Sequence, residues 1–184
     1  MDNARGGPPA NEIEVNGLSV SVERGLLVAS LRYFDRTGSF AAAVRDALGR
    51  PLPECLRAIR FDAAANAAQF LLAWRSPTET LLLCQSHAAF FELEQRLAAA
   101  ADGCMVNQTG GVSVIQVQGP GAGDLLPRLG ASTAIPGLGE ALSGRMAEVQ
   151  VLTACVQEGE FLLLIERAYA RHLLEWIGAT ASDF

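Results

Sequence analysis

Apolar and polar positions alternate along parts of this chain and recur at helical spacing along others, and residues 107–130 show both patterns in succession. Ser113, Ile115 and Val117 share one face of an extended segment, which predicts a strand. The next segment repeats its apolar positions at i, i+3, i+4 and i+7, which predicts an amphipathic helix. That helical face comprises Ala122, Leu125, Leu126 and Leu129.

The ends of this strand–turn–helix unit have their own signals. Gly119 marks the turn, and Pro120 is favoured as the first helical residue because that position has no N–H bond to lose. Gly130 fits a left-handed cap at the end of the helix. Pro127 lies inside the apolar pattern and predicts that the helix is short or kinked there.

The chain contains signs of an internal duplication, in which equivalent residues are 81 positions apart. The offset relates Gly38 to Gly119 and Leu81–Leu83 to Leu162–Leu164. Further pairs are Leu48/Leu129, Gly49/Gly130, Gln69/Gln150, Ala73/Ala154, Glu79/Glu160, Ala89/Ala170, Leu93/Leu174 and Glu94/Glu175. Chance matches in a chain rich in alanine and leucine are the alternative explanation. A true repeat of this length predicts one domain built from two similar units.

The first half should begin with a strand over 26–34. Ser39 is a suitable N-cap for a helix whose apolar face runs from Phe40 to Leu48 and which ends at Gly49. Strands are expected at 59–62, 69–75 and 79–85. Ser86 should cap a long helix with Phe90, Leu93, Leu97 and Ala101 on its buried side, ending at Gly103.

The remaining segments follow the same order. Residues 13–22 suggest an edge hairpin turning at Asn16-Gly17, and 131–144 suggest a loop. A hairpin over 148–165 and a helix over 167–177, ended by Gly178, complete the second half. The predicted fold is α+β: strand-helix-strand-strand-helix units, duplicated and packed as one domain. We expect a disordered tail at 1–12 and a single domain over 13–184, with halves of about 26–103 and 107–178.

The composition of the chain excludes several classes of function. Half of the 184 residues are apolar, which predicts a sizeable core and a surface suited to a partner. The net charge of −6 argues against nucleic acid, since phosphate binding needs clustered basic residues. No apolar run reaches the length of about 20 residues that a membrane helix requires. The N-terminus has no export pattern, so we expect a cytoplasmic protein.

Residues with catalytic or ligand-binding chemistry form no recognisable set. The four cysteines, Cys55, Cys84, Cys104 and Cys155, match no zinc spacing, and we expect reduced, structural thiols. His87 and His172 have no ligand partner at metal-binding spacing. The glycines at 119–123 lack the lysine of a P-loop, which favours a turn over a phosphate site. We therefore predict no catalytic, cofactor-binding or metal-binding residue in this chain.

Several segments, taken in order, carry a family resemblance. They are VQGPGAGDLL at 117–126, FLLLIER at 161–167 and the last helix at 169–177, with ALGRPLP at 47–53 and AWRSPTETLLL at 73–83. Over about residues 26–178 the chain resembles the gamma subunit of heterotetrameric sarcosine oxidase. That family is similar to the folate-binding domain of the glycine-cleavage T-protein, which is itself an internal duplication. The resemblance therefore agrees with the repeat.

The resemblance implies an accessory subunit with no cofactor of its own. Larger alpha and beta subunits and a delta-type subunit would carry FAD, FMN, NAD and the tetrahydrofolate site, and would oxidise N-methyl amino acids. Two departures leave the substrate open: Asn107-Gln108-Thr109 replaces an Asp-x-Ser type start, and VLTACV lacks the usual Trp-Arg. Relatives of this architecture act on N-methylglutamate, proline-like imino acids or other secondary amines.

Two further hypotheses remain beside the accessory subunit: a stand-alone folate-binding one-carbon transferase and a small-ligand-binding module. An accessory subunit needs a surface that holds its partners, and tryptophan is enriched at such contacts. The candidate partner contacts are Trp74, Trp176 and Phe184.

Overall fold

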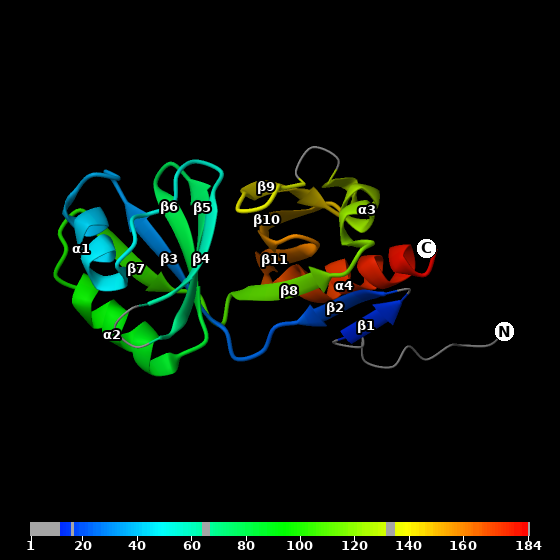
Figure 1. Ribbon diagram of the computed structural model, residues 1–184, viewed down its shortest axis with the longest axis horizontal. Helices are drawn as coiled ribbons and strands as arrows, with labels where there is room; N and C mark the ends of the chain where they lie inside the picture. Colours follow the sequence, from blue (N-terminus) through cyan, green and yellow to red (C-terminus); the bar gives the residue numbers. More distant parts are fainter. Residues whose placement is uncertain (1–11, 16, 64–66, 132–134, 184) are drawn as a thin grey trace.

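The computed structural model describes residues 12–15, 17–63, 67–131 and 135–183. The chain forms two antiparallel sheets that pack face to face, with helices on the two outer sides (Figure 1). The first described strand, residues 12–15, and the last helix, which ends at residue 181, both lie in the second half of the molecule (Figure 1). None of the helices in the described ranges combines the length and the apolar character that a bilayer-spanning helix needs.

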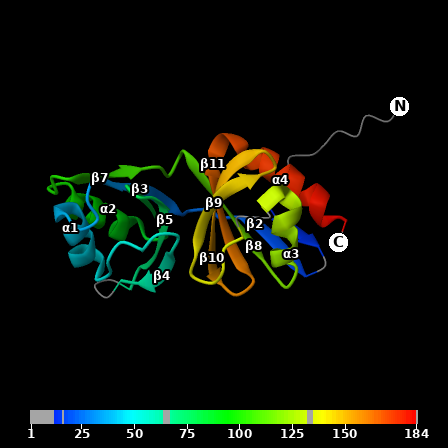
Figure 2. The ribbon, with the colours of Figure 1, turned by 90° about the horizontal axis from the view of Figure 1, so that it is seen from above.

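The first half builds a five-stranded sheet in the order β4-β5-β6-β3-β7. Its strands are β3 (Leu27–Tyr33), β4 (Ala58–Asp62), β5 (Gln69–Ser76), β6 (Glu79–Cys84) and β7 (Gly103–Asn107). Helices α1 (Ser39–Leu48) and α2 (His87–Leu97) cover its outer face (Figure 2). The apolar side of each helix faces the sheet, which is why the 3.6-residue period was visible in the sequence.

The second half builds a six-stranded sheet in the order β1-β2-β8-β11-β10-β9. Its strands are β1 (Glu12–Val15), β2 (Leu18–Val22), β8 (Val112–Gln118), β9 (Ala141–Met146), β10 (Val149–Gln157) and β11 (Glu160–Glu166). Its helical segments are α3 (Ala122–Leu126), the π-helical turn η1 (Pro127–Ala131) and α4 (Arg167–Ala181). The N-terminal hairpin thus joins the sheet of the second half, not of the first.

The core has three layers of apolar contact, and each sheet is buried on both faces. One layer lies between the first sheet and α1 and α2, around Phe40, Phe70 and Phe90. A second lies between the other sheet and α3 and α4. The third lies between the sheets, and its twelve buried residues include Leu71, Leu83 and others from β3 to β11. Burial on both faces explains the continuous apolar runs of β6 and β11, which do not alternate.

The duplication predicted from the sequence is present in the structure. Strands β3, β6, β5 and β4 are neighbours in the same order as β8, β11, β10 and β9. Both central hairpins also carry the same irregularity, a register shift between Trp74 and Ser76 in one and between Cys155 and Gln157 in the other. These two bulges are 81 positions apart, so the offset holds in the backbone as well as in the sequence.

The first strand of each half departs from this offset. Arg32 pairs with Glu79 in the first sheet, and Gln118 pairs with Glu160 in the second. Since the two glutamates are 81 positions apart, Arg32 and Gln118 are 86 positions apart. The first half therefore has five extra residues, 33–37, between Arg32 and Gly38, whose counterparts Gln118 and Gly119 are adjacent.

The two halves meet at a reciprocal backbone bridge. Ala58 N–H donates to the carbonyl of Gly139 at 2.9 Å, and Ala141 N–H donates to the carbonyl of Leu56 at 2.8 Å. Arg57 and Glu140 face each other in this bridge, and their side chains form an ion pair at 3.5 Å. The bridge joins the entry of β4 to the entry of β9, which are equivalent strands, and so fixes the two sheets relative to each other.

Several expected boundaries were wrong. The second helix ends at Leu97 and Gly103 opens strand β7, which was not predicted. Part of the expected loop at 131–144 is strand β9, whose Ser143 and Gly144 hide its alternation; residues 132–134 of that loop lie outside the described residues. The last helix continues through Gly178 to Ala181, because the helical hydrogen bonds extend to Ser182, whose N–H donates to the Gly178 carbonyl at 3.2 Å. The duplicated unit therefore has four strands, β3–β6 in one half and β8–β11 in the other, one more than the predicted strand-helix-strand-strand-helix unit.

The cap of α1 also differs from the prediction. Gly38 is the N-cap and Ser39 is the first helical residue, without a side-chain cap of its own. Asp102 caps the helix from 62 residues beyond Phe40, since its Oδ1 accepts Phe40 N–H at 2.6 Å and the Ser39 hydroxyl at 2.5 Å. These bonds, the Ser39 hydroxyl first, lower the pKa of Asp102. A carboxylate can replace a local cap because it meets the free N–H groups of the first turn.

Other local predictions were confirmed. Ser86 caps α2 by accepting Ala89 N–H at 3.3 Å, and Gly49 and Gly130 take left-handed conformations with φ of 70° and 96°. The helix after β8 breaks at Pro127, where a π-helical turn begins. Pro120, in contrast, lies before the N-cap Gly121 and outside the helix, so its assignment as the first helical residue was wrong.

Candidate functional site

The space between the two sheets is the first place to look for a ligand, because it lies at the centre of the duplication. Apolar side chains such as Leu71, Leu81 and Leu162 fill most of it. A cleft of about 310 Å³ remains at one margin, with apolar walls that include Phe70 and Leu83. The polar groups that line it include Arg60, Gln116 and Glu160.

Glu160 is the centre of the polar side of this cleft. Its side chain is only 13% exposed, and its Oε1 accepts from Arg60 Nη2 at 2.9 Å and from Gln116 Nε2 at 3.1 Å. Strand β11 supplies the carboxylate, β8 the amide and β4 of the other sheet the guanidinium. The three side chains therefore tie the two sheets together. Both neighbours of the carboxylate are donors, as a buried acid requires.

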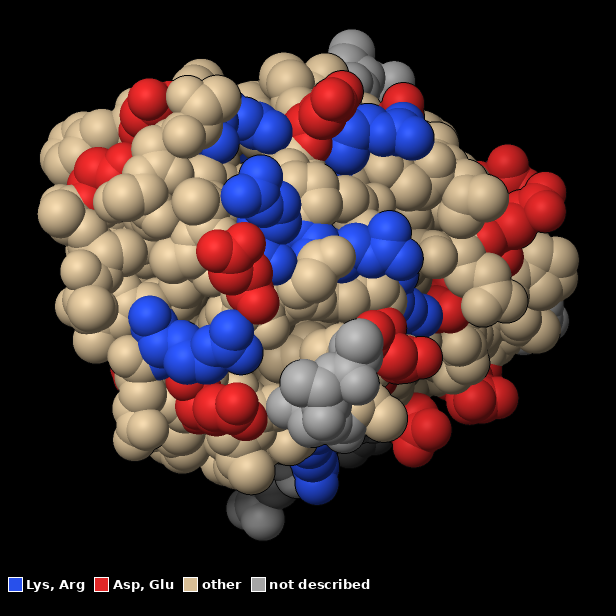
Figure 3. Space-filling view, turned by 60° about the vertical axis from the view of Figure 1, so that its left-hand side comes forward, with Lys and Arg blue, Asp and Glu red and all other residues tan. Residues whose placement is uncertain are grey.

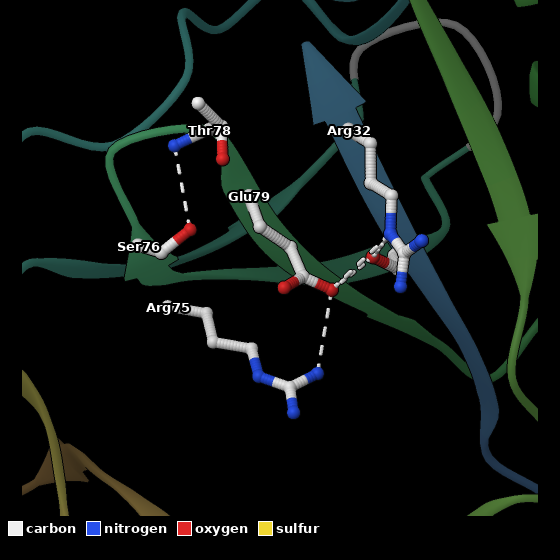
Figure 4. Close-up of polar contacts among 6 residues, drawn as sticks. Arg32, Arg75, Ser76, Thr78 and Glu79 are labelled. Carbon is white, nitrogen blue, oxygen red and sulfur yellow. Dashed lines mark hydrogen bonds and ion pairs between the residues drawn. The ribbon is translucent and has the colours of Figure 1, made fainter.

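Glu79 occupies the equivalent position in the first half and has a cluster of its own (Figure 4). Its side chain is 17% exposed and accepts a short hydrogen bond from the Ser30 hydroxyl. Arg75 Nη1 lies 3.3 Å and Arg32 Nε lies 3.7 Å from the same oxygen. Ser76 and Thr78 close the adjoining turn, where Thr78 N–H donates to the Ser76 hydroxyl at 3.3 Å. Two arginines thus share one carboxylate, and the cluster keeps a net positive charge.

The glycine-rich segment after β8 is a turn. A Cβ on Gly119, whose φ is 122°, would lie 2.2 Å from the carbonyl oxygen of Gly17, so only glycine fits this close approach. Its N–H donates to the Gly159 carbonyl at 3.1 Å and its own carbonyl accepts Ala122 N–H at 3.1 Å. These groups hold the turn against two neighbouring hairpins, which supports the turn over the phosphate site.

The cysteines and histidines do not come together. Cys84 and Cys155 are buried, and burial raises the pKa of both thiols, with the charges of Glu160 and Glu140 adding to the effect at Cys155. Such thiols stay protonated and unreactive. Cys55 and Cys104 are exposed and free. In the part of the chain that the structure describes, no three His, Cys, Asp or Glu side chains are placed to hold a metal ion.

The residues proposed as partner contacts have different environments. Trp74 lies beside the bulge of β5 and is partly buried. Trp176 is half-exposed on α4, with its ring centroid 6.4 Å from that of His172. Phe184 lies outside the described residues. Trp74 thus belongs to a strand of the first sheet, and Trp176 to the helix that packs on the second sheet.

The sequence did not predict the exposure of Phe34, the most exposed aromatic side chain among the described residues. Phe34 is 90% exposed, although the apolar pattern places it at the end of the strand predicted over 26–34. Phe34 lies among the five extra residues of the first half, 33–37, so a comparison of the lengths of the two halves contained a signal for its exposure. Figure 3 shows that charges of both signs alternate on the side of the molecule formed by this half, without a broad basic field of the kind that binds nucleic acid.

Fold and side chains together define a duplicated α+β domain held by two equivalent glutamate clusters, both occupied by internal hydrogen bonds. In a search of known proteins, the model of the sarcosine oxidase gamma subunit family matches residues 35–183. The chain belongs to the sarcosine oxidase gamma subunit family.

Individual proteins agree with this assignment. The gamma subunit of sarcosine oxidase from Corynebacterium sp. (strain U-96) is 24% identical over 146 residues, which are 78% of this chain and 69% of the relative. The crystal structure of heterotetrameric sarcosine oxidase from Corynebacterium sp. U-96, in complex with pyrrole 2-carboxylate, contains a similar fold. Its TM-score is 0.78 at 21% identity, and the match covers 96% of this chain and 90% of that one.

The likeness to the T-protein is confirmed at the level of the fold. The aminomethyltransferase T of the glycine cleavage system from Bartonella henselae matches with a TM-score of 0.65 at 15% identity. The match covers 88% of this chain but 45% of that protein. This chain therefore corresponds to about half of the larger enzyme, and the similarity carries the fold without the activity.

Proposed function

We propose that this chain is a non-catalytic accessory subunit of a multi-subunit, flavin-dependent oxidoreductase of the sarcosine oxidase type. The match of residues 35–183 to the gamma subunit family carries the proposal. The environment of the reactive side chains supports the proposal. Glu79 and Glu160 each bind an arginine and a neutral hydrogen-bond donor, so neither carboxylate is free to act as an acid or base. Burial raises the pKa of the Cys84 and Cys155 thiols. The chain then acts by holding and orienting larger subunits.

The partners follow from the same proposal. Larger alpha, beta and delta-type subunits would carry FAD, FMN, NAD and the tetrahydrofolate site, and the assembly would work in the cytoplasm. The complex would oxidise sarcosine or another N-methyl amino acid and pass the one-carbon unit to tetrahydrofolate. The small charge clusters and the half-exposed aromatics of this chain suit contact with protein surfaces, where aromatic residues and arginine are enriched.

Purification of the tagged chain from its native cells tests this function. We expect larger subunits to co-purify, with the absorbance of bound flavin, and the complex to consume oxygen when sarcosine is added. A chain that elutes alone, colourless and monomeric would contradict the proposal. The isolated chain should then be titrated with tetrahydrofolate and followed by calorimetry.

One observation favours the ligand-binding alternative, namely the cleft of about 310 Å³ beside Glu160 on a T-protein-like fold. Saturable folate binding by the isolated chain, lost in Glu160→Gln, would support a folate-binding protein instead. The internal bonds from Arg60 and Gln116 to Glu160 argue for weak binding, because a ligand must replace them.

A further inference from the structure

The two sheets of the duplication are unequal at one edge. In the second sheet, β2 pairs with β8 and is itself covered by β1. In the first sheet, β7 takes the place of β2 by pairing with β3, and among the described residues no strand follows it. Figure 2 shows β7 along the margin of its sheet with no ribbon beyond it. The first sheet therefore has an open position where the second has β1.

Backbone groups on the outer side of β7 are directed toward this position. Gln108 N–H donates to the carbonyl of Val28 at 2.7 Å, which fixes the phase of pairing between β7 and β3. In an antiparallel ladder the residues one position away point their N–H and C=O groups to the other side. These outward residues are Gly103, Met105 and Asn107. An unpaired row of this kind is a template for another strand.

A groove of about 500 Å³ lies beside the same edge. Phe34, Gly103 and Cys104 line it, together with Arg32 and Glu79 of the cluster described above. Phe34 is 90% exposed and Cys104 is exposed. Phe34 also lies among the five residues, 33–37, that the second half lacks. The first half thus has both an open edge and an added exposed aromatic side chain next to it.

The positive charge of the arginines beside this groove favours a partner segment with carboxylate side chains. Arg32 and Arg75 lie 3.7 Å and 3.3 Å from the same oxygen of Glu79, and both arginines are exposed. One carboxylate cannot satisfy the ten N–H donors of two guanidinium groups. Arg32 pairs directly across from Cys104 of β7, so an acidic side chain on an added strand would lie within reach of it.

Strand β1 shows which sequence fits such a position. Its sequence, Glu12-Ile13-Glu14-Val15, alternates acidic and apolar residues, and Ile13 packs against the core under α4. At the open edge the equivalent side chains would face Arg32 on one side and Met105, which packs on the helical core, on the other. We propose that an extended segment of a partner subunit, alternating acidic and apolar residues, adds as a sixth strand to β7 and contacts Phe34.

Hydrogen exchange on the assembled complex tests this inference, which rests on the proposed function for the existence of a partner. In the isolated chain the amides of Met105 and Asn107 should exchange rapidly. In the complex they should exchange at least about tenfold more slowly, because they become hydrogen-bonded. Cys104 should also become protected from maleimide. Unchanged exchange at both amides in an assembled complex would overturn the inference and leave the proposed function intact.

Two variants with matched controls test the same surface. Met105→Pro removes the outward N–H and should weaken assembly by about tenfold relative to Met105→Ala, which keeps it. Arg32→Glu should weaken assembly by a similar factor, because Arg32 lies across from Cys104 of β7, while Arg45→Glu, at an exposed arginine on α1, should not. Circular dichroism confirms that each variant is folded. Equal affinities within both pairs would overturn the inference.

Two other results would also decide against it. A wild-type chain that forms no complex would overturn both this inference and the proposed function. An isolated chain that dimerises, and becomes monomeric in Met105→Pro, would assign the edge to a second copy of the chain rather than to a partner subunit. Light scattering after size exclusion separates these cases.

Discussion

Glu79 and Glu160 occupy the same position in the two halves of the duplication. Each stands just after the turn of its central hairpin, opposite the residue that ends the bulge, and each accepts a hydrogen bond from the strand alongside. The donors are Ser30 and Gln116, which are themselves equivalent because they pair with Leu81 and Leu162. The duplication has therefore kept the acid and changed its partners.

Removal of Glu160 should destabilise the fold. Glu160→Ala leaves the guanidinium of Arg60 and the amide of Gln116 without their acceptor between the sheets. We expect the free energy of unfolding to fall by about 1–3 kcal/mol, since the lost bonds involve a charged, mostly buried acceptor. Urea denaturation followed by circular dichroism measures the change.

A surface glutamate provides the control for this substitution. Glu148 is 91% exposed and its carboxylate lies 3.5 Å from Arg145. Glu148→Ala should change the free energy of unfolding by less than about 0.5 kcal/mol. Equal losses in the two variants would show that the contact between Glu160, Arg60 and Gln116 does not hold the sheets together.

Asp102 should make the stability of the first half depend on pH. Its pKa is lowered, first by the Ser39 hydroxyl and then by Phe40 N–H, so the folded state favours the charged form. A lowered pKa contributes stability that is fully present above the ordinary value of 3.8 and is lost as the pH falls through the lower folded-state value. Between pH 6 and pH 2 the wild type should therefore lose more stability than Asp102→Ala.

Asp102→Asn separates charge from capping in this experiment. Asparagine can still accept the two hydrogen bonds but does not titrate. It should be more stable than Asp102→Ala at pH 6 and show the same weak pH dependence. Urea midpoints at several pH values measure both effects. If the stability of Asp102→Ala depended on pH as strongly as that of the wild type, the Asp102 carboxylate would not be the group that stabilises the start of α1.

The sequence predicted the strands and helices that have a strong period, and the duplication predicted their order. Prediction from the sequence failed for features that depend on contacts between distant segments. The cap of α1 comes from Asp102, which no local rule connects to Ser39. Strands β7 and β9 are short edge strands, and Gly103 and Gly144 break their alternation. Edge strands depend on a neighbour more than on their own residues.

The candidate site shows the same limit. The glutamate pair was visible as Glu79 and Glu160 at the repeat offset, but its polar partners were not. Arg60 reaches Glu160 from the other sheet, 100 positions away. The exposure of the two tryptophans was not predictable from the sequence, because Trp74 and Trp176 have similar apolar neighbours along the chain and differ only in what the fold places over them. The periodicity of apolar residues thus predicts helices and strands, whereas the side chains that meet in a site depend on how distant segments pack together.

Gly103 should tolerate no side chain, although it lies in a strand and not at a helix end. An added Cβ would lie 2.4 Å from the ring of Phe40 and 2.6 Å from the carbonyl oxygen of Arg32. Gly103→Ala must move either α1 or β3, and we expect a loss of about 1–3 kcal/mol in the free energy of unfolding.

Gly123 is the matched control, because nothing lies within 4 Å of its added Cβ. It stands in α3, where alanine is favoured over glycine by about 0.5–1 kcal/mol. Gly123→Ala should therefore leave the thermal midpoint unchanged or raise it. A Gly103→Ala protein as stable as the wild type would mean that the close packing of α1 on β7 is absent in solution.

Thiol labelling distinguishes the two pairs of cysteines. Cys55 and Cys104 are exposed, whereas Cys84 and Cys155 are buried and burial raises their pKa. Maleimide reacts with the thiolate, so at pH 7 the native isolated chain should take up label at Cys55 and Cys104 alone. In urea all four should react, which controls for the reagent. Peptide mass spectrometry identifies the labelled positions, and rapid labelling of Cys155 in the native chain would show that the bulge of β10 opens to solvent, contrary to the packing described above.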